Sequence, residues 1–237
     1  MPRPKRNLNL TPRKTYKDFE PDQYIQNLIN STSSLKYSSI KTTAANTLVQ
    51  PETLEDLMAI IRSAIAKHGN SVDLNFIDTS KITDMHGLFG VSPVMGFSEF
   101  NGDISQWDVS NVTDMSFMFN HNKKFNQDLS NWNVSNLKKA GNMFDSSVFD
   151  LPLVTWNLPK LTNASSMFSG AKFNQDLSSW DLSSAVDVSY MFYNNKQITP
   201  DNVSLISVNP SANTDNIFTG SQLEAVYGED GDKLFES

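Results

Sequence analysis

The 237-residue chain contains no cysteine, only 3 histidines and only 10 glycines. The absence of thiols excludes a disulfide framework, a cysteine-ligated zinc site, an iron–sulfur cluster and a thiol nucleophile. No stretch approaches the roughly 18 apolar residues that span a bilayer as a helix. Residues 1–15 lack the apolar region and the cleavage site of a conventional secretory signal. We therefore expect no membrane span and no conventional leader.

Basic residues are fewer than acidic ones, 19 against 26, so the formal net charge is -7. A globally acidic chain is a poor candidate for general nucleic-acid or anionic-membrane binding. Residues 1–17 nevertheless contain six basic residues and no acid. We interpret them either as a solvated tail or as an arm that docks on an acidic protein surface or a polyanion. The six candidate docking residues are Arg3, Lys5, Arg6, Arg13, Lys14 and Lys17.

What the chain has in excess is 15 phenylalanines, 9 methionines and 4 tryptophans. The tryptophans are spaced by 25, 24 and 24 residues, and each has a phenylalanine seven positions before it and a Met-Phe pair ending twelve positions after it. This self-similarity is the signature of a repeat architecture. The columns are Trp107, Trp132, Trp156 and Trp180; Phe100, Phe125, Phe149 and Phe173; Met118, Met143, Met167 and Met191; and Phe119, Phe144, Phe168 and Phe192.

Weaker copies flank the four repeats at 77–89 and 206–218, which brings the number of turns to about six. In each copy the segment around the tryptophan suits a short strand with a bulge or turn, and Val112–Phe119 has the apolar spacing of one helical or 3₁₀ turn. Stacking such turns about 4.8 Å apart places like residues over like. We therefore predict an α+β repeat solenoid with turns of 24–26 residues, short parallel strands and an aromatic core.

The window FNGDISQWDVSNVTDMSFMF at 100–119 resembles the repeats of the BspA family of leucine-rich-like surface proteins. The resemblance covers roughly residues 74–218. It implies a leucine-rich-repeat-like solenoid, display on a cell surface, and adhesion or protein binding. Because we identify no secretion signal, we keep a second setting open, which is a virion or another large cytoplasmic assembly.

Residues 51–69 carry an apolar stripe at helical spacing, with Pro51 in the first turn and Gly69 at the end. We predict a helix there that caps the open end of the solenoid and leads into a strand at 72–76. A shorter helix is expected over 21–30, followed by a Ser/Thr-rich linker. The predicted organisation is an attachment segment at 1–50, the capping helix and lead-in at 51–73, the solenoid at 74–218 and an acidic tail at 219–237.

No catalytic, cofactor or metal-binding constellation emerges, so we predict a chain that is not an enzyme. The three histidines have no ligand spacing. Columns of aspartate run through the repeats, one through Asp103, Asp128 and Asp176 and another through Asp108 and Asp181. We interpret each aspartate as the cap of its own turn, with calcium binding or a polysaccharide-cleaving acid pair as the less favoured readings.

Positions that vary between copies are the candidates for function. Phe117 and Tyr190 are large aromatic residues at a column where other copies have small polar residues. Solenoids use such positions as extended binding faces. We therefore predict a non-enzymatic interaction protein, which displays a binding face that includes Phe117 and Tyr190 and is anchored through its N-terminal segment.

Overall fold

The computed structural model describes residues 39–42, 47–91, 97–204 and 206–231. The basic arm, with all six candidate docking residues, and the helix expected over 21–30 lie outside the described residues. Regular elements are few and short in the described part. They are β1 (Ser39–Thr42), β2 (Thr47–Gln50), α2 (Leu54–His68), β3 (Asp181–Leu182), α3 (Pro200–Val203), β4 (Ser207–Val208) and α4 (Glu224–Tyr227).

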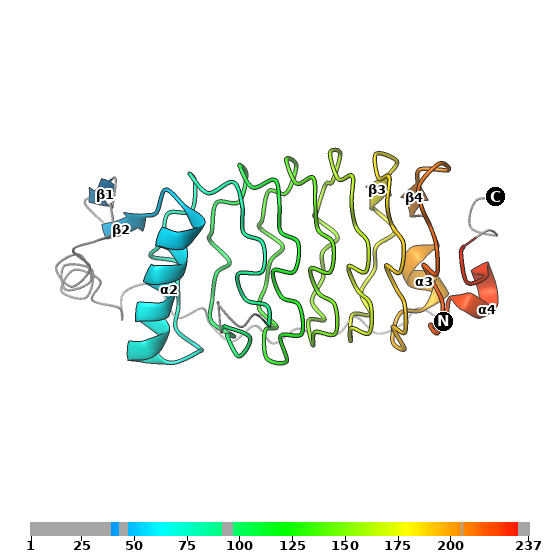
Figure 1. The fold of residues 1–237 in the computed structure, drawn as a ribbon, viewed down its shortest axis with the longest axis horizontal. Helices are drawn as coiled ribbons and strands as arrows, with labels where there is room; N and C mark the ends of the chain where they lie inside the picture. The colour runs from blue at the N-terminus through cyan, green and yellow to red at the C-terminus, as the bar shows by residue number, and fades with distance from the viewer. Residues whose placement is uncertain (1–38, 43–46, 92–96, 205, 232–237) are drawn as a thin grey trace, which may run out of the picture.

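Between α2 and α4 the chain winds through coils that lie side by side in one row (Figure 1). A parallel bridge joins each coil to the next, and the bridge residues are 30, 25, 24, 24 and 26 positions apart. The pair β3 and β4 adds a second parallel contact between neighbouring coils, with Asp181 opposite Ser207. The bridge residues are Asp84, Asp114, Lys139, Asn163, Asp187 and Asn213.

The segment Val112–Phe119 is not the helical or 3₁₀ turn that we predicted. The N–H of Met118 donates to the carbonyl oxygen of Met115 over 3.1 Å, which closes a β-turn. The N–H of Met115 donates to the carbonyl oxygen of Lys139, which belongs to the next coil. Phe117, the third residue of that turn, has a φ of 60°, which no right-handed helix contains. Hydrogen bonds between coils therefore replace those of a helix.

The strands expected around the tryptophans are also shorter than predicted. In that part of the coil only Asp181–Leu182 pairs as a strand, and the other described copies form turns, as where the N–H of Trp132 donates to Leu129. Because successive β-turns change the direction of the chain, the tryptophan segments of the coils do not stay extended long enough to pair as longer strands.

The interior of the stack is aromatic and methionine-rich. All sixteen residues of the four repeat columns are at most 3% exposed. Rings of one column lie nearly parallel along the stack: the centroids of Phe119 and Phe144 are 5.4 Å apart, and those of Trp132 and Trp156 are 6.4 Å apart. The two phenylalanine columns also touch each other, with 4.1 Å between the ring centroids of Phe119 and Phe125. Each coil thus buries its rings only against its neighbours.

Helix α2 covers the N-terminal end of the stack (Figure 1). It begins later than predicted, because Thr53 is the N-cap and accepts the N–H of Asp56, so Pro51 precedes the helix. Gly69 ends it and donates its N–H to the carbonyl oxygen of Ile65, 2.8 Å away. The buried side chains of α2 are Leu57, Ile60, Ile61 and Ala64.

Residues 72–76 do not form the lead-in strand that we predicted. A single parallel bridge forms instead at the next residue, Ile77. Its partner there is Val49 of β2, which is fully buried. Residues 47–50 therefore pack with the body, although we assigned them to the attachment segment. Their apolar side chains continue the stack by one contact beyond the first coil.

The chain after residue 218 is not simply an acidic tail, because its described part, up to Gly231, packs on the last coil. Leu223 and Gly231 are buried, and the ring of Tyr227 lies 5.6 Å from that of Phe218. The N–H of Phe218 donates to the carbonyl oxygen of Glu229 over 2.9 Å. The acidic residues of this segment thus close the C-terminal end of the stack.

Candidate interaction face

The aspartate side chains of the acidic columns accept hydrogen bonds from nearby main-chain N–H groups. Within one coil, Asp103, Asp108 and Asp114 each accept the N–H of the serine two positions later, at 2.8, 3.0 and 2.9 Å. Each aspartate therefore closes a turn of its own, a geometry for which Asx residues are favoured. The sequence signal for these turns is a recurrent Asp-x-Ser, which occurs three times in residues 103–116, and the third column, that of Asp114, is not among the two columns of the prediction.

The described residues offer no ready metal centre. They contain no group of three or more histidine, aspartate or glutamate side chains placed to hold an ion. His86 contacts Asp84, with 2.9 Å between Nδ1 and Oδ1, and His121 lies 3.8 Å from Asp145 in a different coil. Within the described ranges, the search for membrane spans likewise finds no helix of the necessary length and apolarity.

Neither of two depressions on the described surface joins two carboxylates. One is lined by Glu52, Ser80, Lys81, Thr83 and Asn111. The other is lined by Asn126, Val148, Asp150, Lys172 and Gln197. Each holds a single acid, so the acid pair needed for glycoside hydrolysis is found in neither.

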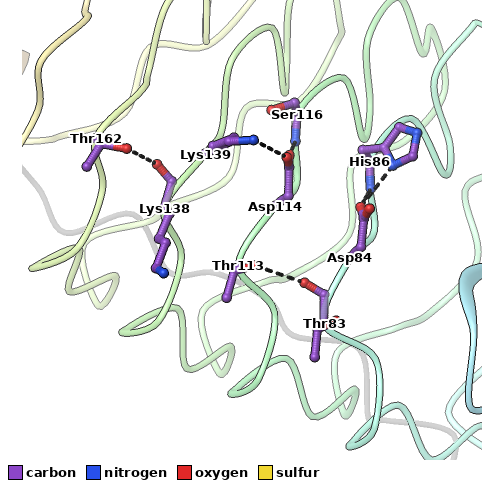
Figure 2. Close-up of polar contacts among 9 residues, drawn as sticks. All are labelled: Thr83, Asp84, His86, Thr113, Asp114, Ser116, Lys138, Lys139 and Thr162. Carbon is purple, nitrogen blue, oxygen red and sulfur yellow. Dashed lines mark hydrogen bonds and ion pairs between the residues drawn. The ribbon is translucent and has the colours of Figure 1, made fainter.

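The parallel bridges define a continuous surface along the stack, which we call the bridge face. It consists of residues 83–87, 113–117, 138–142, 162–166, 186–190 and 212–216. Figure 2 shows how its polar side chains join neighbouring coils: the hydroxyl of Thr113 donates to the carbonyl oxygen of Thr83, and that of Thr162 to Lys138, over 3.3 and 3.0 Å.

Charge on the bridge face changes along the stack. Asp84 and Asp114 occupy the bridge positions of the first two coils, and Lys139 follows them with its Nζ 3.4 Å from Oδ2 of Asp114 (Figure 2). Lys138 lies beside it and is also exposed. Sequence reasoning missed this lysine pair because its significance depends on its acidic neighbours in the adjacent coil.

One column of the bridge face has left-handed backbone in every coil, with φ between 54° and 63°. Glycine, asparagine and serine fill it in four coils, and the two remaining positions are the candidate residues Phe117 and Tyr190. A bulky side chain at this φ is a genuine outlier and stores strain. The column is Gly87, Phe117, Asn142, Ser166, Tyr190 and Asn216.

Both strained aromatics are exposed, Phe117 by 48% and Tyr190 by 41%. The hydroxyl of Tyr190 accepts a hydrogen bond from Nδ2 of Asn216 in the next coil, 3.3 Å away, and its ring lies edge-on to that of Tyr193 at 5.6 Å. Val186, in the same coil, is 59% exposed. The aromatic neighbourhood of Tyr190 therefore includes residues that the repeat pattern alone did not single out.

Two carboxyl groups outside the bridge face have shifted pKa values. Removal of water by packing raises the pKa of Asp73, and the nearby Asp103 carboxylate raises it further, while the N–H of Asn75 partly offsets both. Hydrogen bonds from Ser183 lower the pKa of Asp181. The two acids occupy different columns, so their shifts are local effects of each turn.

A family described as Mycoplasma protein of unknown function, DUF285, matches the chain over residues 60–172 and again over 146–226. Together the two matches span most of the chain, which therefore belongs to this family. Comparison with the curated proteins and with the solved structures finds no match.

Proposed function

We propose that this DUF285 member is a leucine-rich-repeat-like solenoid without enzymatic activity, which binds a protein partner through the bridge face and is attached through its N-terminal segment. The expected setting is surface adhesion or attachment. The resemblance of its repeats to those of BspA-family surface proteins supports this setting.

The observation that carries the proposal is the pair of exposed aromatics at left-handed positions. Phe117 and Tyr190 occupy sites where glycine or asparagine fits without strain. Each ring remains about half exposed despite the strain, and a cost retained at the surface points to a role outside folding. Large aromatics surrounded by polar side chains are also typical anchors of protein interfaces.

A repeat stack suits this role for a physical reason. Each coil contacts only its neighbours, so the interior fixes the rise and the register while outward side chains vary freely. The bridge face then presents aromatic, acidic and basic groups at constant spacing, from Asp84 through Lys139 to Tyr190. Such a surface fits an extended partner better than a small ligand.

A structural or decoration role in a virion or other large assembly is the second candidate. The basic arm favours it, because six cationic side chains at 1–17 complement an acidic assembly surface and need no secretion route. A polysaccharide-acting enzyme has less support, since the column acids Asp103, Asp108 and Asp114 serve as turn caps.

The test compares copurifying proteins of the tagged full chain and its variants by quantitative mass spectrometry in native cells. The double variant Phe117→Asn/Tyr190→Asn is expected to lose the partner at least tenfold. Val154→Asn is the matched control, because Val154 is 48% exposed but lies outside the bridge face. Equal recovery by all three chains would show that the face does not bind the partner.

A second variant separates attachment from recognition. Deletion of residues 1–17 should release the chain from its assembly while leaving its melting transition unchanged, because this segment has six basic residues and few apolar side chains to bury. Copurification with virion proteins that depends on the arm, and not on Phe117, would favour the assembly role.

A further inference from the structure

On this side of the stack, most main-chain hydrogen bonds between neighbouring coils run from an N–H of the earlier coil to a carbonyl oxygen of the later coil. At the last junction, the N–H groups of Tyr190, Phe192 and Asn194 donate to the carbonyl oxygens of residues 215, 217 and 219, at 2.9, 2.9 and 2.8 Å. Earlier junctions repeat this row of donors. The last coil consequently has a row of N–H donors with no further coil to receive them.

The corresponding N–H groups, at Asn216, Phe218 and Gly220, are satisfied by the C-terminal segment. Asn216 donates to Oδ1 of Asp230 over 2.6 Å, and Gly220 donates to Oε2 of Glu224 over 2.7 Å. Between them, Phe218 donates to the carbonyl oxygen of Glu229. Two carboxylates and one carbonyl thus replace the carbonyl row of a further coil.

Besides these three hydrogen bonds, the C-terminal segment 221–231 also makes apolar contacts with the last coil. Leu223 is fully buried, and Tyr227 packs on Phe218. Gly231 approaches the last coil so closely that a Cβ there would lie 3.1 Å from the ring of Phe218. Helix α4 between these contacts spans only four residues and buries none of them.

We propose that this donor row is an exchangeable docking edge, and that its second occupant is the segment 221–231 of another copy of this chain. The end of a stack of parallel coils presents a row of main-chain N–H donors, which any segment with suitably placed acceptors can occupy. A second copy brings the same two carboxylates and the same carbonyl, so the exchange needs no new complementarity. This inference concerns the end of the stack and is independent of the bridge-face proposal.

The acidic character of the segment follows from the same geometry. A carboxylate that accepts an N–H makes a stronger hydrogen bond than a carbonyl oxygen does. Glu224 and Asp230 therefore suit the row better than neutral acceptors, whereas the side chain of Glu229 contributes only charge, because its main-chain oxygen makes the contact.

The test uses the full chain with the segment weakened by Glu224→Ala/Asp230→Ala. Amide hydrogen exchange at Asn216 and Gly220 should accelerate at least tenfold, because each loses its charged acceptor. A labelled peptide of residues 221–231 should then bind the double variant at least tenfold more tightly than wild type. Wild type refolded from denaturant at high concentration should form exchanged dimers in sedimentation velocity, whereas the double variant, whose own segment lacks the two carboxylates, should stay monomeric.

Two controls make the outcome decisive. Glu229→Ala removes a charge from the same segment and keeps the carbonyl, so it should exchange and bind like wild type. Leu223→Ala retains both carboxylates and loosens the segment from its buried side, so it should exchange and bind the peptide like the double variant. The proposal is overturned if the peptide does not bind the opened chains, if refolded wild type stays monomeric, or if Glu229→Ala matches the double variant.

Discussion

The indole N–H of Trp132 donates to the carbonyl oxygen of Ile104 in the preceding coil, 3.1 Å away. The same oxygen accepts the main-chain N–H of Trp107, also at 3.1 Å. The arrangement recurs where Trp156 donates to Leu129 and Trp180 to Leu153. Each tryptophan thus fills the interior and also ties two coils together through its one polar atom.

Truncation of Trp132 should destabilise the chain strongly. Trp132→Ala leaves a large cavity in a central coil and removes one of the two hydrogen bonds to the Ile104 carbonyl oxygen, so we expect a loss of about 3–5 kcal/mol in the free energy of unfolding. Trp132→Phe keeps a ring and should lose roughly half as much. Urea unfolding followed by circular dichroism measures both. A loss below about 1 kcal/mol for the alanine variant would contradict the interior position.

Relief of strain at Phe117 should stabilise the chain. Phe117→Asn places a residue that tolerates left-handed backbone at a φ of 60°, so we expect a gain of about 0.5–1 kcal/mol in the free energy of unfolding. Val154→Asn, at another exposed apolar position, should change it by less than about 0.5 kcal/mol. Thermal unfolding of both variants measures these changes. A clear loss of stability in Phe117→Asn would mean that the exposed ring contributes to folding.

Removal of the buried Asn122 side chain should be costly. Its Nδ2 donates to the carbonyl oxygens of Phe89 and Phe100, and its Oδ1 accepts the N–H groups of Lys124 and Phe125. Asn122→Ala leaves these groups unpaired and should cost about 2–4 kcal/mol in denaturant unfolding.

The control for Asn122 is Asn111→Ala. Asn111 is exposed and donates to the carbonyl oxygen of Ser80, which water can replace as a partner. We expect a loss below about 1 kcal/mol. Similar losses for the two variants would mean that burial of the amide at position 122 is unimportant.

Stability should depend on pH through Asp73. Because its pKa in the folded chain lies above the ordinary value of 3.8, the folded chain holds this proton more tightly than the unfolded chain does. The resulting stabilisation is complete below pH 3.8 and is lost as the pH rises through the folded pKa. Asp73→Asn keeps an oxygen for the N–H of Asn75 and cannot ionise.

The variant Asp73→Asn should therefore be more stable than wild type at pH 7 and indistinguishable from it at pH 3. Unfolding in urea across this pH range measures the difference. Asp176→Asn, at a repeat position whose side chain accepts the N–H of Ser178, serves as the matched control. A stability difference for Asp73→Asn that stays constant with pH would contradict the raised pKa.

Sequence reasoning located the candidate aromatics but not their geometry. Phe117 and Tyr190 stood out as large residues in a column of small ones, yet their backbone was assigned to a helical turn. The presence of Gly87, Asn142 and Asn216 in that column was the available signal, because these types favour left-handed backbone. Apolar spacing outweighed it in our prediction.

The C-terminal segment was misjudged for a different reason. Its acids look like a solvated tail, since charged residues near a terminus are usually exposed. Glu224 and Asp230 accept N–H groups of the last described coil, and these donors are available because the segment itself, rather than another coil, packs against them. Nothing local to the segment contains this information.

The sequence alone determined the period and the residues that fill the interior, because identical columns of Trp, Met and Phe recur at a nearly constant interval. The lack of cysteine and the scarcity of histidine had already removed whole classes of chemistry. Only the tertiary structure decided that the coils are built from turns and which residues adopt left-handed backbone. It also decided which groups accept the N–H donors of the last coil. These features depend on hydrogen bonds between coils about 25 residues apart, which local sequence preferences do not encode.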